Sequence, residues 1–214
     1  MSVPLPLRVA FVPGVTLRKW TTRWAERRPG MPLEVLPTAE SDILGLLHDS
    51  SADLAFVRLP IEREGLSVIR LYGEAPVVVV SRDDELADEA SVALAAVSGA
   101  VERPQSAKDA VELVAAGVGR VILPHSIARM TARKDVVAIP ISDAPETDIA
   151  LVWVADATTA DIEEFVGIVR GRTAASSRAV PTPPTPRHRA PADRDRPKAQ
   201  VRKPRQQGRR RQGR

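Results

Sequence analysis

Apolar runs alternate with polar breaks along residues 5–172 in a way that predicts an α/β fold. Amphipathic patterns typical of helices occupy residues 16–28 and 41–49, between short apolar runs. The runs with strand-like composition lie at residues 7–12, 33–36, 53–57, 68–71 and 77–80. This alternation of strand and helix favours parallel-rich sheets with right-handed crossovers.

A second set of elements follows the polar stretch at residues 81–84. Gly117 suits the left-handed position after a helix end, and Pro124 suits the start of a helix. Residues 121–123 have the composition of a strand buried on both faces of a parallel sheet. Thr159 is expected to begin the last helix. The other expected elements are apolar residues 92–97, a helix at 106–116 and β-rich runs at 136–141 and 149–154.

Charge is distributed unevenly along the chain. Residues 178–214 contain 13 Lys and Arg and two acidic residues, a formal charge of +11. Residues 1–177 contain 18 basic and 25 acidic residues, a charge of −7. From about residue 174 onward there is no Phe, Trp or Tyr, so too little apolar surface is available to offset the entropy of ordering. We predict a folded domain over residues 5–172 and a disordered basic tail over residues 173–214.

Three stretches of the folded part, taken together, resemble a known family. They are residues 7–14 with the helix that ends at Arg28-Pro29, residues 51–57, and residues 113–126. In combination they are similar to the effector-binding (substrate-binding) domain of LysR-type transcriptional regulators. The likeness covers about residues 5–172.

This resemblance implies a two-lobed type 2 periplasmic-binding-protein fold with a small-molecule effector between the lobes. We expect lobe I to comprise about residues 5–81 and 150–172, and lobe II about residues 82–149. Lobe II looks shortened, because few residues separate Ala95 from Ser106. The family carries a helix-turn-helix before this domain, and we expect none here because the first predicted strand begins close to the start of the sequence.

Candidate ligand-binding residues follow from the resemblance, which puts the effector near strand ends and helix N-termini. Unpaired N–H groups and a partial positive charge at a helix N-terminus suit a carboxylate. Thr16 could bind the ligand through its hydroxyl or only cap its helix. Arg58 directly follows a strand and could clamp an anion, unless it is solvated or paired with an acidic residue. The candidates are Gly14, Val15, Thr16, Arg58, Gln105, Ser106, Pro124 and His125.

Some candidates have a plain structural alternative. Ser106 suits the N-cap of its own helix, and His125 suits a surface or structural position. Trp20 and Trp24 repeat at helical spacing, which fits a core or a dimer face better than a stacking platform.

The sequence gives little support for catalysis or for a bound cofactor. It has no cysteine, and its three histidines lie far apart without metal-ligand spacing. Gly117 and Gly119 precede a strand rather than a helix, so they do not form a nucleotide-binding fingerprint. No Gly-x-Ser-x-Gly elbow is present. We expect no enzyme, no cofactor and no metal.

Two function hypotheses remain open. The first is a cytoplasmic, LysR-like regulatory protein that binds a small anionic metabolite, as a homodimer or paired with full-length LysR-type regulators. The cytoplasmic location follows because no apolar run approaches the roughly 18 residues of a membrane span and no secretion segment is visible.

The second hypothesis is a vestigial scaffold whose basic tail binds nucleic acid without sequence preference. Its phosphate contacts would come from the tail cations, which also suit a merely solubilising extension. These cations are Arg202, Lys203, Arg205, Arg209, Arg210 and Arg211.

Overall fold

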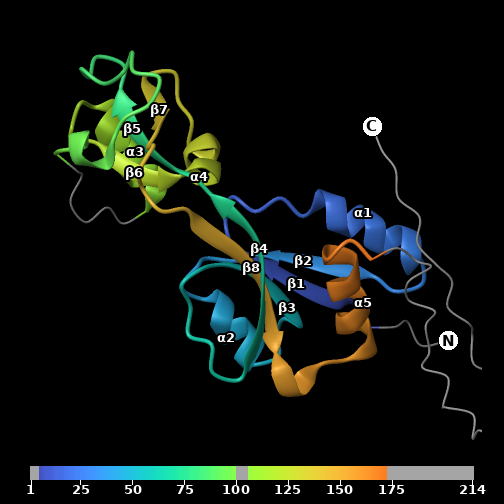
Figure 1. Ribbon diagram of the computed structural model, residues 1–214. Helices are drawn as coiled ribbons and strands as arrows, with labels where there is room; N and C mark the ends of the chain where they lie inside the picture. The colour runs from blue at the N-terminus through green and yellow to red at the C-terminus, as the bar shows by residue number, and fades with distance from the viewer. Residues whose placement is uncertain (1–4, 100–105, 173–214) are drawn as a thin grey trace, which may run out of the picture. The chain divides into compact units, whose positions relative to one another are not determined.

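The computed structural model describes residues 5–99 and 106–172, all of which belong to one compact unit of the chain. The expected tail and Gln105 therefore lie outside the described residues. Two sheets organise this unit (Figure 1). The larger has five strands in the order β2-β1-β3-β8-β4, and the smaller has three in the order β6-β5-β7.

The strands of the larger sheet are β1 (Leu7–Phe11), β2 (Leu33–Pro37), β3 (Leu54–Arg58), β4 (Leu66–Glu74) and β8 (Thr147–Val154). Helices α1 (Arg18–Arg27), α2 (Ile43–His48) and α5 (Ala160–Val169) accompany it, with a 3-10 turn at Ala155–Ala157. We call this part, residues 5–75 and 147–172, lobe I.

The strands of the smaller sheet are β5 (Pro76–Ser81), β6 (Val121–Pro124) and β7 (Val136–Pro140). Helices α3 (Ala107–Ala115) and α4 (His125–Met130) belong with it, as does a 3-10 turn at Leu94–Ala96. We call this part, residues 76–99 and 106–146, lobe II.

The α/β class is confirmed, with mixed rather than uniformly parallel-rich sheets. Strand β1 pairs in parallel with β2 and β3, whereas β8 runs antiparallel to β3 and β4. In lobe II both pairings of β5 are antiparallel. The prediction that residues 121–123 lie buried in a parallel sheet was wrong. Because β6 is an edge strand, Ile122 is 40% exposed.

The lobe boundaries in the structure also differ from those expected. Strand β5 was expected in lobe I, but it is the central strand of the smaller sheet. Only Ala75 separates β4 from β5, so the apolar run at 77–80 reads in sequence like one more strand of the same sheet. The return strand β8 begins at Thr147, a few residues before the expected boundary.

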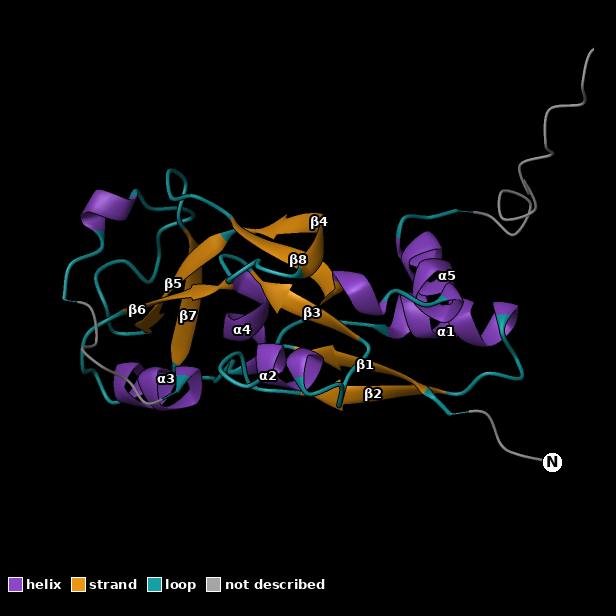
Figure 2. Ribbon diagram, turned by 90° about the horizontal axis from the view of Figure 1, so that it is seen from below, coloured by secondary structure: helices purple, strands orange, loops and turns teal. Residues whose placement is uncertain are grey.

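Lobe I has a core built around aromatic side chains. The Trp20 ring stacks on Phe56 with centroids 4.7 Å apart, and Phe165 meets Trp24 edge-on at 5.8 Å. Trp20 and Trp24 are 6% and 1% exposed, which confirms their expected place in a core. Helices α1 and α5 lie side by side and bring these rings together (Figure 2).

The helix boundaries confirm two of the three expected caps. The hydroxyl of Ser106 accepts a hydrogen bond from the amide of Asp109, and that of Thr159 from the amide of Ile162. Thr16 does not cap α1, because the N-cap position falls on Leu17. The buried Leu17 side chain fixes where the chain enters this helix, which leaves Thr16 in the preceding loop.

Helix α3 ends as the sequence predicts. Gly117 has φ +80°, in the left-handed region that favours glycine. Its amide donates to the carbonyl of Val114, and the amide of Val118 donates to that of Leu113. These two bonds satisfy the last carbonyls of the helix in a Schellman arrangement.

None of the described helices combines the length and the apolar character needed to cross a bilayer.

Candidate functional site

A pocket of about 480 Å³ opens at the carboxyl ends of the parallel strands β1 and β2. We call it the β1–β2 pocket. Loop residues after β1 and β2 contribute most of its wall, and α4 contributes Met130. The lining residues are Phe11, Pro13, Gly14, Val15, Thr16, Pro37, Thr38, Ala39 and Met130. Three of the sequence-predicted residues, Gly14, Val15 and Thr16, are therefore brought together here.

The polar groups of this pocket are neutral. Thr16 is exposed and does not cap α1, and its hydroxyl makes no hydrogen bond to another described residue. Thr38 donates its hydroxyl to the carbonyl of Leu36 at 3.0 Å and keeps lone pairs free. Within the described chain, the amides of Gly14 and Thr16 also have no acceptor. Residues that line the pocket thus carry unused hydrogen-bond donors next to apolar side chains.

Gly14 has a backbone conformation and a neighbour that both require glycine. Its φ is +90°, and a Cβ there would overlap the side chain of Ser126 at the start of α4. The Ser126 hydroxyl is buried and has no partner among the described residues. Gly14 therefore lets a lobe II helix approach the loop that follows β1.

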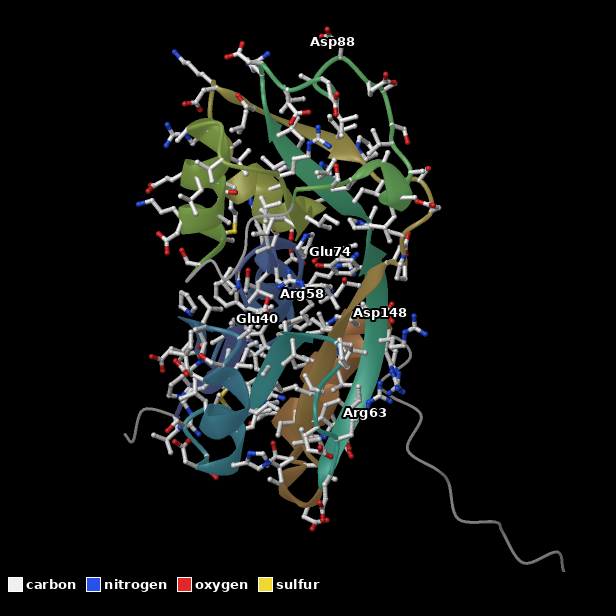
Figure 3. The ribbon with its side chains drawn as sticks, turned by 90° about the vertical axis from the view of Figure 1, so that its left-hand side faces the viewer. Glu40, Arg58, Arg63, Glu74, Asp88 and Asp148 are labelled. Carbon is white, nitrogen blue, oxygen red and sulfur yellow. The ribbon has the colours of Figure 1, made fainter. Side chains whose placement is uncertain are left out.

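Arg58 lies beside this pocket but is already occupied. Its side chain is 7% exposed, and its Nε and Nη2 donate to Glu74 Oε2 at 3.1 and 2.8 Å. Nη2 also donates to the carbonyl of Pro13 at 3.2 Å, and Nη1 pairs with Glu40. Figure 3 shows Arg58 gathered with the two glutamates. Of the possibilities open for Arg58, the structure has the acid-paired one.

Burial raises the pKa of the nearby Tyr72 hydroxyl, and the negative charge of Glu74 raises it further while Arg58 lowers it.

The remaining predicted residues do not line the β1–β2 pocket. Ser106 caps α3, and Pro124 is a half-buried residue at the end of β6. The side chain of His125 is exposed, although its amide donates to the carbonyl of Ala75 at 3.1 Å. Gln105 lies outside the described residues.

Sequence reasoning missed Thr38 and Met130. Thr38 comes two residues after the end of a predicted strand, just as Gly14 does, and parallel strands place such residues at one sheet edge. That signal could have found Thr38. Met130 lines the pocket because of where α4 packs, and no local sequence pattern predicts that packing.

A larger pocket of about 570 Å³ lies in lobe II. Its cation, Arg120, is 9% exposed and already pairs with Asp84 and Glu85. Hydrogen bonding by Arg120 lowers the pKa of Asp84. Gly99, which lines this lobe II pocket, is the last described residue before residues 100–105, which the structure does not describe. We therefore take the β1–β2 pocket as the candidate site. Among the described residues, no group of three or more His, Cys, Asp and Glu could hold a metal ion.

The two-sheet fold is the periplasmic-binding-protein-like fold that solved effector-binding domains also have. Within that fold class, residues 6–100 match the family model of the LysR substrate binding domain. This match confirms, over residues 6–100, the resemblance predicted from sequence. No curated protein matches the chain at significant similarity.

Solved structures show the same fold over most of the described chain. The Corynebacterium glutamicum OxyR C206 mutant is 23% identical with a TM-score of 0.65, covering 79% of this chain and 64% of that one. The reduced form of OxyR is 20% identical with a TM-score of 0.66, covering 79% and 96%. The BenM effector-binding domain with its effector benzoate is 16% identical with a TM-score of 0.64, covering 82% and 95%. The match thus covers less than two thirds of the length of the first of these proteins, the Corynebacterium glutamicum OxyR mutant.

Proposed function

We propose that this chain is a non-catalytic, LysR-like sensing domain that binds a small anionic metabolite in the β1–β2 pocket. The observation that carries the proposal is the set of unused donors at Gly14 and Thr16, beside an apolar wall. Ligands of open α/β sheets bind at the carboxyl ends of parallel strands, where this pocket lies. Its volume falls in the usual range for small-molecule sites, roughly 300–1,000 Å³.

The chemistry of the pocket favours a carboxylate with an apolar body. Phe11, Val15 and Met130 supply apolar contacts, while hydroxyl and amide donors suit carboxylate oxygens. BenM holds benzoate, a ligand of this type. The redox forms named for OxyR offer a poorer guide, because this chain has no cysteine.

Ligand binding would act by shifting the population of lobe arrangements. Gly14 belongs to lobe I and Met130 to lobe II, and both line the pocket. A ligand that contacts both favours the arrangement in which they are close. The regulatory output would then pass to a second copy or to a full-length LysR-type regulator, as the family resemblance implies.

A thermal-shift screen with small carboxylates, each paired with its uncharged amide, tests this proposal. We expect a carboxylate to raise the melting temperature of the wild type more than its amide does. The Thr16→Val variant should weaken binding about five- to tenfold through loss of a hydrogen bond of about 1 kcal/mol. Thr22→Val, on an exposed part of α1 outside the pocket, serves as the matched control. Failure of every carboxylate to stabilise the protein would refute the proposal.

The charge of residues 178–214 favours a second candidate function, non-specific nucleic-acid binding by the tail. Several arginines would release counterions from phosphates, so affinity should fall steeply with salt. Deleting residues 178–214 should abolish salt-dependent retention of DNA or RNA. Retention by the truncated chain, or none by the intact chain, would exclude this role.

A further inference from the structure

Arg58 lies immediately behind one wall of the β1–β2 pocket. Strand β1 is paired in parallel with both β2 and β3, with Phe11 opposite Pro37 on one side and Phe56 on the other. The chain continues from Phe11 to Pro13 and from Phe56 to Arg58, and these two residues are joined by a hydrogen bond of 3.2 Å. Since Pro13 lines the pocket, the guanidinium is separated from it by little more than this loop.

The two glutamates that contact Arg58 differ in how firmly they are held. Glu74 is the last residue of β4, has a side chain 7% exposed and accepts two hydrogen bonds from Arg58. Glu40 lies in the turn after β2, has a side chain 55% exposed and meets only Nη1. Breaking a buried pair is strongly unfavourable, whereas an exposed contact contributes little. The contact with Glu40 is therefore the one that can open.

The charge of the cluster also favours exchange at Glu40. Arg58 and Glu74 form a neutral buried pair, so Glu40 gives the group a formal charge of −1. An anion that entered beside Glu40 would be repelled, because like charges at close range disfavour each other. If the Glu40 side chain rotates into solvent, the N–H groups of Nη1 become free to bind a carboxylate. When a ligand carboxylate takes the place of Glu40, the charge around Arg58 stays the same.

Glu40 is also connected to the pocket through the chain. It directly follows Ala39, and Pro37, Thr38 and Ala39 all line the pocket. A movement of Glu40 away from Arg58 would therefore be passed directly to a residue of the pocket wall.

We propose that Glu40 is an internal carboxylate that occupies the anion-binding group of Arg58, and that an effector carboxylate displaces it. This inference rests on the proposed function, because it assigns the regulation of the same pocket. Glu40 then sets the ligand concentration at which the pocket fills, and Arg58 is the cation that the bound effector contacts.

Calorimetric titration of the full chain with benzoate and with its uncharged isostere benzamide tests this inference. The Glu40→Gln variant should bind benzoate at least about fivefold more tightly than the wild type, with benzamide affinity unchanged. Glu34→Gln is the matched control, because it removes the same charge from an exposed residue of β2 for which no ion pair is found among the described residues.

The outcomes separate this inference from the proposed function. Equal benzoate affinity of Glu40→Gln and wild type would overturn the inference alone. An equal gain for benzamide would also overturn it, since Glu40 would then act by bulk rather than by charge. An equal gain in Glu34→Gln would do so too, by showing a general charge effect. Absence of benzoate binding in every variant would overturn the inference and count against a carboxylate effector.

Discussion

The two lobes are stabilised in different ways. Lobe I has a core that joins α1, α5 and the sheet through Trp20, Trp24, Phe56 and Phe165. The sequence of residues 76–146 contains no aromatic residue, and the apolar clusters of lobe II lie on the two faces of a three-stranded sheet. This contrast indicates that the core of lobe I is built on large aromatic side chains, while the core of lobe II depends on smaller aliphatic contacts.

Each lobe nevertheless contains one buried arginine paired with acidic residues. In lobe II, Arg120 donates to Asp84 at 2.9 and 3.0 Å and to Glu85 at 2.8 Å. In lobe I, Arg58 joins Glu74 and Glu40 beside the β1–β2 pocket. The same kind of ion pair thus stabilises a small lobe in one place and borders a candidate binding site in the other.

The largest effect is expected from truncating the aromatic core of lobe I. Phe165→Ala should lower the free energy of unfolding by about 3–5 kcal/mol, because Phe165 is fully buried against Trp24 and Phe56. Val114→Ala, fully buried in lobe II, should cost only about 2 kcal/mol. Urea unfolding followed by circular dichroism measures both. Equal losses would contradict the difference drawn between the lobes.

A somewhat smaller loss is expected from breaking the ion pairs of lobe II. Arg120→Met should destabilise the protein by about 3 kcal/mol, since it leaves Asp84 largely buried without its partner. Arg133→Met breaks only an exposed pair with Asp135 and should leave the melting temperature unchanged. If both variants melt like the wild type, lobe II does not depend on Arg120.

The same pair predicts a pH dependence of stability. Hydrogen bonding by Arg120 lowers the pKa of Asp84 from its ordinary value of 3.8 in the folded state. The pair therefore contributes fully above that value, and its contribution is lost as the pH falls through the lower folded pKa. The stability gap between wild type and Arg120→Met should shrink below pH 3.8. A gap that stayed constant in acid would argue against this assignment.

The smallest effects are expected at the helix caps. Ser106→Ala in lobe II and Thr159→Ala in lobe I should each lower the free energy of unfolding by about 1 kcal/mol. In both cases the hydroxyl accepts a hydrogen bond from a backbone amide in the first turn of its helix. Thr16→Ala should leave stability unchanged, since α1 has no side-chain cap. Thermal melts of the three variants check this order. A loss at Thr16 as large as at Ser106 would show that Thr16 caps its helix after all.

Local chemistry was sufficient to predict much of the fold. Gly117, Ser106 and Thr159 are each specified by the backbone conformation or hydrogen bond of a few neighbouring residues. The assignment of β5 to a sheet depends instead on pairing with residues some forty or more positions later in the sequence. Nothing in the sequence of residues 77–80 indicates which of the two sheets the strand joins.

The candidate site could be predicted only in part, for a similar reason. Gly14 and Thr16 follow the first strand, so their place at a sheet edge is a local consequence of the α/β pattern. The pairing of Arg58 with Glu74 depends on β8 lying between β3 and β4 and pairing with both, which is a tertiary arrangement. Sequence alone left the clamp and the ion pair open as alternatives for Arg58.

Binding of a small carboxylate in the β1–β2 pocket is the central claim, and amide chemical-shift mapping by NMR tests it most directly. Titration with the best ligand of the carboxylate screen should shift the amides of Gly14, Thr16, Thr38 and Met130 together, with one common dissociation constant. Shifts confined to the lobe II pocket around Asp84 and Arg120, or no shifts at all, would contradict the claim.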